Sequence, residues 1–253
     1  MKYVKSCIIA FSMYSKIPMP GIAWEQEAMK YVMCFFPWVG AVIGCCFYLL
    51  GIYGRQIPIN SQLYGALLTV LPVLLTGGIH MDGFLDTIDA LSSWQTRERR
   101  LEILKDSHAG AFAVIGGCVY FLLYFGFASE LNPHEIPVAA LGFFLSRCLS
   151  GYAVTSFPCA KDSGLAAIFS SGADKKNAGF ILLLEAILAM AGLLWLDRIA
   201  GLALVLVSFL AFFGYYRMSI NKFGGITGDL AGWFLQVCEL LQLFSLIIVG
   251  KFL

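Results

Sequence analysis

Residues Gly77 to Gly110 read GGIHMDGFLDTIDALSSWQTRERRLEILKDSHAG and interrupt a chain that is otherwise almost continuously apolar. Over its 253 residues the sequence is 59% hydrophobic and only 13% charged, far from the composition of an average soluble domain. Apolar runs near the span length of about 20 residues lie at 31–54, 61–79, 109–129, 136–156, 179–196, 199–216 and 231–250. We therefore predict an all-α fold, a polytopic transmembrane helical bundle of about seven spans that forms one integral membrane domain over residues 1–253.

The basic residues are distributed unevenly along the chain. Most of the 17 Lys and Arg residues lie in the N-terminal segment and in segments near 80–108, 157–178 and 217–230. The positive-inside rule places these segments in the cytoplasm, and the acidic residues that are candidates for chemistry lie there too. Residues 4–19 are too short and too punctuated by Lys and Pro for a span, so we predict an N-terminal interfacial helix. We expect a multi-pass protein of the cell (inner) membrane whose active site faces the cytoplasm.

Three carboxylates in the interrupting segment share one face of a predicted helix. Asp82, Asp86 and Asp89 fall at i, i+4 and i+7. Such close charges are tolerated when water dilutes them or a cation neutralises them, and carboxylate oxygens suit Mg²⁺ or Mn²⁺. The basic run from Arg97 to Lys105 follows, as is typical of a site that holds a metal and a phosphorylated substrate. The alternative is a solvated amphipathic helix with no ligand.

Two further side chains have alternative interpretations. Arg147 lies within a predicted span, where a charge is costly, so it either binds phosphate in a polar cavity or pairs with Glu185 or Glu239. His80 precedes the acidic stripe and is either a functional group or an interfacial histidine whose hydrogen bonds are satisfied. The sequence leaves both choices open.

The loop at 221–229 reads NKFGGITGD and comes directly before a predicted helix. Its glycines allow the backbone to approach a ligand closely, and a helix N-terminus favours an anion. Asp229 either caps the helix or combines capping with contact to a substrate. Elsewhere, eight cysteines without a CxxC pair argue against zinc or a disulfide framework, and a net charge of +1 gives no indication of a nucleic-acid surface.

Several motifs taken together are similar to one family of membrane enzymes. They are GGIHMDGFLDTID at 77–89, LKDS at 104–107 followed by Gly110, GGITGD at 224–229, KIPMP at 16–20 and FPWVG at 36–40. This set covers nearly the whole chain and resembles cobalamin synthase, the family of adenosylcobinamide-GDP ribazoletransferases. The chain departs from the pattern at Lys16, Ala90 and His108, where the family usually has Arg, Gly and Arg.

The resemblance implies a Mg²⁺-dependent transfer, with Mn²⁺ as the alternative metal, in which a hydroxyl of α-ribazole or its 5′-phosphate displaces GMP from adenosylcobinamide-GDP. The product is adenosylcobalamin or its 5′-phosphate, so the reaction completes the nucleotide loop of vitamin B12. Asp82, Asp86 and Asp89 then hold the metal. The catalytic candidates are Asp82, His80 and Asp106, one of which takes the proton from the hydroxyl. The predicted substrate-binding residues are Lys105, Ser107, Arg147, Gly224, Gly225, Thr227 and Asp229.

The resemblance also implies a surrounding lipid bilayer and is compatible with docking to other membrane-bound cobalamin-assembly enzymes and with a homo-oligomer. Two other Mg²⁺-dependent membrane enzymes are alternatives. A prenyltransferase normally has two separated aspartate motifs, and a CDP-alcohol phosphotransferase has Ala-Arg after its DG, whereas this chain has one cluster and Phe84-Leu85. A vitamin or ion transporter is the alternative of another class, but its acids are expected near the membrane midplane rather than in cytoplasmic segments.

Overall fold

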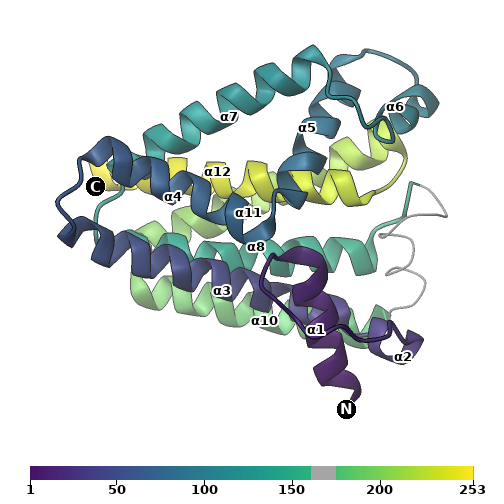
Figure 1. Cartoon of the computed structure of the whole chain (residues 1–253), viewed down its shortest axis with the longest axis horizontal. Helices are drawn as coiled ribbons and strands as arrows, with labels where there is room; N and C mark the ends of the chain where they lie inside the picture. Colours follow the sequence, from purple (N-terminus) through teal and green to yellow (C-terminus); the bar gives the residue numbers. More distant parts are fainter. Residues whose placement is uncertain (161–174, 253) are drawn as a thin grey trace.

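The computed structural model describes residues 1–160 and 175–252, and all the regular secondary structure in these ranges is helical except for an isolated bridge between Cys159 and Ile226. Figure 1 shows long helices that run side by side along the longest axis of the molecule. The helices are α1 (Lys2–Tyr14), α2 (Gln26–Met29), α3 (Val32–Tyr53), α4 (Ser61–Thr76), α5 (Ile79–Ser92), α6 (Arg97–Ile103), α7 (Ala111–Glu130), α8 (Ile136–Ser156), α10 (Lys175–Leu196), α11 (Arg198–Met218) and α12 (Gly228–Phe252). A 3₁₀ turn (Gly54–Gln56) follows α3, and a π turn (Ser219–Phe223) follows α11.

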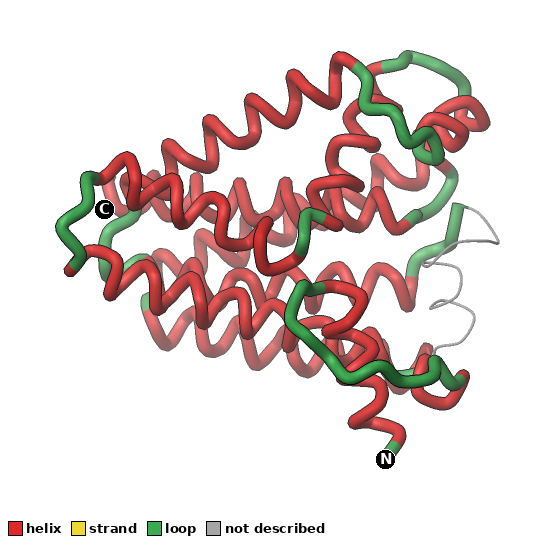
Figure 2. Tube along the Cα trace, viewed as in Figure 1, coloured by secondary structure: helices red, strands yellow, loops and turns green. Residues whose placement is uncertain are grey.

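Six helices of the described chain are long and apolar enough to cross a membrane, namely α3, α7, α8, α10, α11 and α12. The predicted run at 61–79 corresponds to α4 and the bend that follows it, and it is long enough to cross a membrane only when α4 and α5 are counted as one bent span, so the described chain has six such helices, or up to seven spans. The prediction of an all-α polytopic bundle is therefore confirmed. Figure 2 shows that the loops gather at the two ends of the bundle, as expected of antiparallel spans joined by short connections.

The break between α4 and α5 departs from a simple span. The two helices meet at 96°, and α5 runs across the bundle rather than through it (Figure 1). Gly77 and Gly78 make the bend because both adopt left-handed backbone angles, with φ of 66° and 82°, which cost other residues about 1–2 kcal/mol each. The amide of Gly78 donates to the Val73 carbonyl at 3.0 Å and closes the end of α4. As a result α5 lies outside the spanning segments and carries its polar face across one end of the bundle.

Helix α8 lies at the centre of the bundle. About four-fifths of its span is buried (78%), against 28% for α7 and for α10. Gly40 and Gly44 of α3 allow this packing, since a Cβ on Gly44 would lie 2.2 Å from the carbonyl oxygen of Ala140 in α8. At the other side, α7 leans away from α12 at the end where α5 lies, and α5 fills the space between them (Figure 1).

The N-terminal helix α1 runs across the bundle at the same end as α5 (Figure 1). It packs against α3, and the Ser6 hydroxyl donates to the Ala28 carbonyl at 2.7 Å. This orientation is that of the predicted interfacial helix rather than of a span. The end of the bundle that carries α1, α5 and α6 is therefore the polar end, and it holds the candidate site.

Candidate functional site

Two glycines let the backbones of α5 and α12 touch. A Cβ on Gly83 of α5 would lie 2.7 Å from the Cα of Asp229, and a Cβ on Gly232 of α12 would lie 2.9 Å from the His80 carbonyl oxygen. Only glycine fits at either position, because real Cβ atoms do not approach other atoms so closely. The crossing brings the first turn of α12 beside the acidic stripe of α5, so Asp229 joins the carboxylates there.

The proximity of these carboxylates is seen in the ionisation of Asp86. Burial and, after it, the neighbouring charges of Asp82, Asp229 and Asp89 together raise the pKa of Asp86 to about 6. The side chain is half-buried, whereas Asp82 is exposed and Asp229 half-buried. The carboxylates therefore concentrate negative charge at this place, which is the electrostatic condition for binding a cation.

Asp89, the third member of the stripe, is engaged elsewhere. Its Oδ2 accepts a hydrogen bond from the Gly110 amide at 2.5 Å, and its Oδ1 accepts one from the Ala113 amide at 2.9 Å. These amides lie at the start of α7 and have no partner within that helix, so Asp89 acts as its cap from a distant part of the chain. Helical spacing placed Asp89 on the same face as Asp82 and Asp86, and both of its carboxylate oxygens accept hydrogen bonds from backbone amides.

The remaining carboxylates fit a metal ion that a substrate helps to hold. Within residues 1–160 and 175–252, no three Asp, Glu, His or Cys side chains lie close enough to bind one ion together. Mg²⁺ is usually bound by one or two carboxylates, with substrate phosphates and water as the other ligands. Asp82, Asp86 and Asp229 supply oxygen ligands of this kind at one exposed place, so the donor set suits an ion bridged to a phosphorylated substrate.

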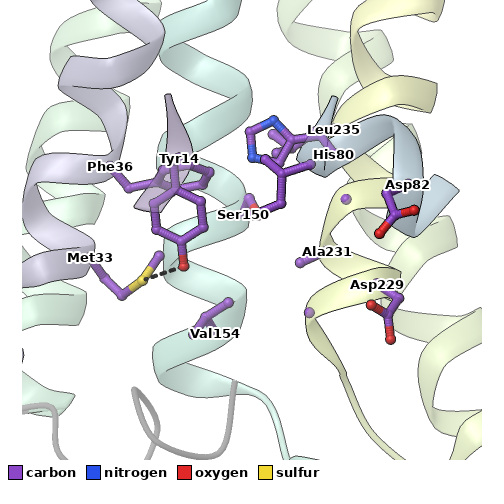
Figure 3. A pocket seen from close by; sticks show the side chains of 13 residues that line it. Tyr14, Met33, Phe36, His80, Asp82, Ser150, Val154, Asp229, Ala231 and Leu235 are labelled. Carbon is purple, nitrogen blue, oxygen red and sulfur yellow. Dashed lines mark hydrogen bonds between the residues drawn. The ribbon is translucent and has the colours of Figure 1, made fainter. Parts of the chain in front are cut away.

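A cavity of about 250 Å³ lies next to the carboxylates and extends between the helix ends. It is lined by Tyr14, Met33, Phe36, Ile79, His80, Asp82, Ser150, Val154, Gly228, Asp229, Ala231, Gly232 and Leu235. In Figure 3 the carboxylates of Asp82 and Asp229 lie on one side, the rings of Tyr14 and Phe36 lie on the other, and the His80 ring lies between them. The cavity thus joins an acidic part to an aromatic part.

His80 is buried in this cavity with only 4% of its surface exposed. Neither of its ring nitrogens has a hydrogen-bond partner among the residues that the structure describes. The Tyr14 ring stacks on it with centroids 6.1 Å apart, and the Phe36 ring meets it edge-on at 5.8 Å. The structure therefore does not fit the alternative that His80 is an interfacial histidine whose hydrogen bonds are satisfied. Its imidazole is available to bind a ligand.

The glycine loop before α12 is anchored to the end of the segment that follows α8. The Ile226 amide donates to the Pro158 carbonyl at 2.8 Å, and the Ala160 amide donates to the Ile226 carbonyl at 2.9 Å. The Thr227 hydroxyl accepts a hydrogen bond from the Leu230 amide at 3.2 Å and so caps α12. The Thr227 hydroxyl also donates to the Asp229 carboxylate at 3.4 Å, so the capping residue contacts the carboxylate cluster.

An arginine that the sequence analysis did not select contacts this loop. Gly224 has φ of 74°, and a Cβ on it would lie 1.9 Å from the Cζ of Arg97, so the guanidinium rests directly on the glycine. Close by in α6, the buried Nε of Arg100 has no hydrogen-bond partner among the described residues. The basic run was recognisable in the sequence, but only the packing of α6 on the π turn shows which of its members reach the loop.

Three predicted residues lie apart from the cavity. Lys105, Asp106 and Ser107 are exposed in the link between α6 and α7 and do not line the cavity. Hydrogen bonds from the ring and the backbone of His108 hold the pKa of Asp106 below its usual value. Because His80 and Asp82 line the cavity and Asp106 does not, the positions of these residues favour His80 or Asp82 as the proton acceptor.

Arg147 adopts the paired alternative. Its guanidinium binds the Glu239 carboxylate, and the two side chains are only 1% and 3% exposed. The Ser146 hydroxyl lies 3.0 Å from the guanidinium and 3.2 Å from the Glu239 carboxylate. The other candidate, Glu185, accepts a hydrogen bond from the Trp38 indole at 3.0 Å. Arg147 does not line the cavity, so the structure assigns it to the core of the bundle.

The comparison with known families identifies the chain. A family model described as cobalamin-5-phosphate synthase matches residues 6–247. The chain belongs to the cobalamin-5-phosphate synthase family. A relative in Lachnoclostridium phytofermentans, named adenosylcobinamide-GDP ribazoletransferase, is 46% identical over 98% of this chain and 95% of its own length. Relatives with the same name in Clostridium botulinum and Desulfitobacterium hafniense are 33% and 32% identical over at least 95% of both chains. No solved structure matches.

Membership of the cobalamin-5-phosphate synthase family confirms the resemblance that the motifs indicated. The matched range includes the acidic helix α5, the basic helix α6 and the glycine loop before α12. The prenyltransferase, CDP-alcohol phosphotransferase and transporter alternatives lose their support accordingly. Of the predicted segment 157–178, residues 161–174 lie outside the part of the chain that the structure describes.

For this member of the cobalamin-5-phosphate synthase family, we expect Asp86→Asn to raise the midpoint of thermal unfolding at neutral pH in EDTA. The pKa of Asp86 in the folded protein, about 6, lies above its ordinary value of 3.8. The folded protein therefore binds the extra proton between about pH 4 and 6, and its stability falls as pH rises through this window. The variant removes this penalty, so its advantage should be largest above pH 6 and shrink towards pH 4.

Scanning fluorimetry of the two detergent-purified proteins from pH 4 to 8 measures this difference. The substitution Glu130→Gln, on an exposed residue paired with Lys251 at the other end of the bundle, serves as the control for removing a carboxylate. A midpoint for Asp86→Asn at or below that of the wild type at pH 7.5 would show that the cluster is not repulsive.

Proposed function

We propose that the chain is an adenosylcobinamide-GDP ribazoletransferase. It transfers the adenosylcobinamide phosphate group of adenosylcobinamide-GDP to a hydroxyl of α-ribazole or its 5′-phosphate and releases GMP. The names of the relatives support this assignment over nearly the full length of the chain. The observation in the structure that supports it most is the proximity of Asp82, Asp86 and Asp229, of which Asp82 and Asp229 line a cavity that also contains His80.

The chemistry requires charge neutralisation on a diphosphate. The acceptor oxygen forms a bond to the phosphorus that carries the cobinamide, the bond from this phosphorus to the GMP oxygen breaks, and the hydroxyl proton passes to a base. A Mg²⁺ ion held by one or two carboxylates of the cluster of Asp82, Asp86 and Asp229, and otherwise by the diphosphate and water, would neutralise the charge that develops on the phosphoryl oxygens. Compared with the metal ligands predicted from the sequence, this proposal has Asp229 in place of Asp89, because the Asp89 carboxylate caps α7.

The basic side chains beside the cluster would position the anionic groups. The Arg97 guanidinium rests on Gly224, and Arg100 has an unsatisfied buried Nε in the same helix. Guanidinium groups match phosphate oxygens in geometry and charge, and the glycine backbone allows a phosphate to approach the loop closely. We assign this side of the cluster to the diphosphate, with the GMP end leaving towards solvent.

His80 is the proton acceptor in this proposal. Its imidazole lies between the carboxylates and the aromatic part of the cavity (Figure 3), and its nitrogens have no partner among the described residues. A hydroxyl that reaches from the cavity towards Asp82 and Asp229 passes the imidazole. Burial lowers the pKa of His80 well below its ordinary value, so the imidazole is neutral at physiological pH and would accept the proton only as it leaves the attacking oxygen.

The proposal extends to the location of the reaction. The polar end of the bundle carries the basic helix α6 and the N-terminal basic residues, and the positive-inside rule assigns that end to the cytoplasm. We therefore place the site at the cytoplasmic face of the cell membrane, where the nucleotide substrates are available.

The experiment that tests the function measures GMP release and corrinoid product by protein reconstituted in liposomes. The substrates are adenosylcobinamide-GDP with α-ribazole or α-ribazole 5′-phosphate, with Mg²⁺, with Mn²⁺ or with EDTA. We expect stoichiometric GMP and cobalamin-type product with the metal and at least a 100-fold lower rate in EDTA. Folded protein that forms no product with either acceptor would contradict the assigned reaction, and an unchanged rate in EDTA would contradict the metal.

A further inference from the structure

The part of the cavity away from the carboxylates has walls suited to a flat apolar group. The rings of Tyr14 and Phe36 pack with centroids 4.4 Å apart, and the Tyr14 hydroxyl lies 3.9 Å from the Met33 sulfur. Val154 of α8 and Leu235 of α12 line the cavity with aliphatic surface. Figure 3 shows these side chains around the space that opens towards His80. Aromatic and thioether groups of this kind bind planar rings by stacking and edge contacts.

One hydroxyl in this apolar lining has no partner. Ser150 of α8 is 1% exposed, lines the cavity, and its Oγ has no hydrogen-bond partner among the described residues. Neighbouring hydroxyls on helices of the bundle bond back to their own backbone, as Thr155 does to the Gly151 carbonyl at 3.2 Å. A buried hydroxyl without a partner is unfavourable unless a ligand completes it. A ligand bound here is therefore expected to be mostly apolar and to place one polar atom within hydrogen-bonding distance of the Ser150 hydroxyl.

The proposed reaction brings two heterocycles to the protein, and their polar edges differ. Guanine presents hydrogen-bonding groups on nearly every edge, and an apolar cavity would leave most of them unpaired, which is costly. The base of α-ribazole is a dimethylbenzimidazole attached to ribose through one nitrogen. It therefore offers a single ring-nitrogen acceptor, two methyl groups and otherwise carbon surface.

We infer that this cavity binds the base of the acceptor nucleoside and selects an apolar bicyclic ring whose one free nitrogen accepts a hydrogen bond from the Ser150 hydroxyl. The inference rests on the proposed function, and it adds where the acceptor nucleoside binds and which residues recognise its base. With the base between Tyr14, Phe36 and Val154, its ribose extends past His80 to the carboxylates of Asp82 and Asp229. The acceptor hydroxyl then arrives where the diphosphate is held.

Filling the cavity tests the location. Val154→Phe adds a ring to the cavity wall, whereas Val114→Phe makes the same change on the exposed face of α7 and serves as the matched control. We expect Val154→Phe to raise the KM for α-ribazole 5′-phosphate at least tenfold while the KM for adenosylcobinamide-GDP changes less than twofold. The control should change neither value by more than twofold. An unchanged acceptor KM, or a rise confined to adenosylcobinamide-GDP, would overturn the inference.

Ser150→Ala tests the recognition and does not depend on a bulky residue being tolerated. The acceptors compared are α-ribazole 5′-phosphate and its indole analogue, in which C–H replaces the free ring nitrogen. We expect the wild type to prefer the benzimidazole at least fivefold in kcat/KM and Ser150→Ala to prefer it less than twofold. An undiminished preference in the variant would overturn the inference while leaving the function intact. A wild type that turns over neither acceptor would overturn the function itself, and the inference with it.

Discussion

Replacing Asp82 with asparagine is expected to reduce the rate of GMP release by about 10²–10³-fold, the loss typical when one electrostatic contact to a transition state is removed. Asp82 is exposed and lines the cavity beside Asp229, and asparagine has the same shape, so the fold should not change. What is lost is one of the negative charges that would hold a cation against the diphosphate. Single-turnover assays with adenosylcobinamide-GDP, at saturating acceptor, measure the effect.

The control for this prediction removes a carboxylate of similar exposure from the other end of the bundle. Glu130 of α7 pairs with Lys251, and Glu130→Gln should keep the rate within threefold of the wild type. Both variants should elute from gel filtration like the wild type and unfold at a midpoint no lower than that of the wild type. If Asp82→Asn retained more than a tenth of the wild-type rate, the phosphoryl group would have to be stabilised elsewhere.

Arg147→Met is expected to destabilise the bundle by about 3–5 kcal/mol, the cost of leaving one partner of a buried ion pair uncompensated. Arg147 and Glu239 are almost completely buried and bind each other between α8 and α12. Without the guanidinium, the Glu239 carboxylate stays among apolar helices and must take up a proton or unfold its surroundings. Unfolding by a denaturing detergent, followed by circular dichroism, measures the loss.

The double variant Arg147→Met with Glu239→Leu separates this structural role from substrate binding. When both charges are replaced by apolar groups, most of the stability should return, because neither partner remains unpaired. If Arg147 instead bound a phosphate, Arg147→Met would keep its stability and lose activity, and the second substitution would restore neither. That outcome would return Arg147 to the substrate-binding residues.

The spans were predictable because the bilayer imposes a simple length and composition on each of them. The apolar run at 136–156 coincides with α8, and that at 31–54 lies within two residues of α3. The run at 61–79 extends beyond α4, which ends at Thr76. Gly77 and Gly78 were the residues in the sequence that indicated this break. A search for apolar runs of span length cannot detect it, because it takes no account of a backbone conformation that only glycine adopts easily.

The candidate site was predictable in its residue types and only partly in its grouping. Helical periodicity placed Asp82, Asp86 and Asp89 on one face of α5. In the structure the charges of Asp82 and Asp89 both raise the pKa of Asp86. Periodicity within one helix contains no information about other helices. It therefore did not indicate that the start of α7 occupies Asp89, nor that Gly83 admits Asp229 into the cluster.

The proposed acceptor pocket is bounded both by helices long enough to span the membrane and by α5, which lies across the end of the bundle. The pocket is formed by the ends of α3, α8 and α12, whose depth and tilt follow the thickness of the surrounding hydrocarbon. Part of the carboxylate face lies on α5, which does not span and is joined to α4 through a glycine bend. We therefore expect the distance between the proposed acceptor pocket and the carboxylates to depend on the thickness of the bilayer. Turnover of substrates that are themselves soluble in water should then vary with the length of the lipid acyl chains.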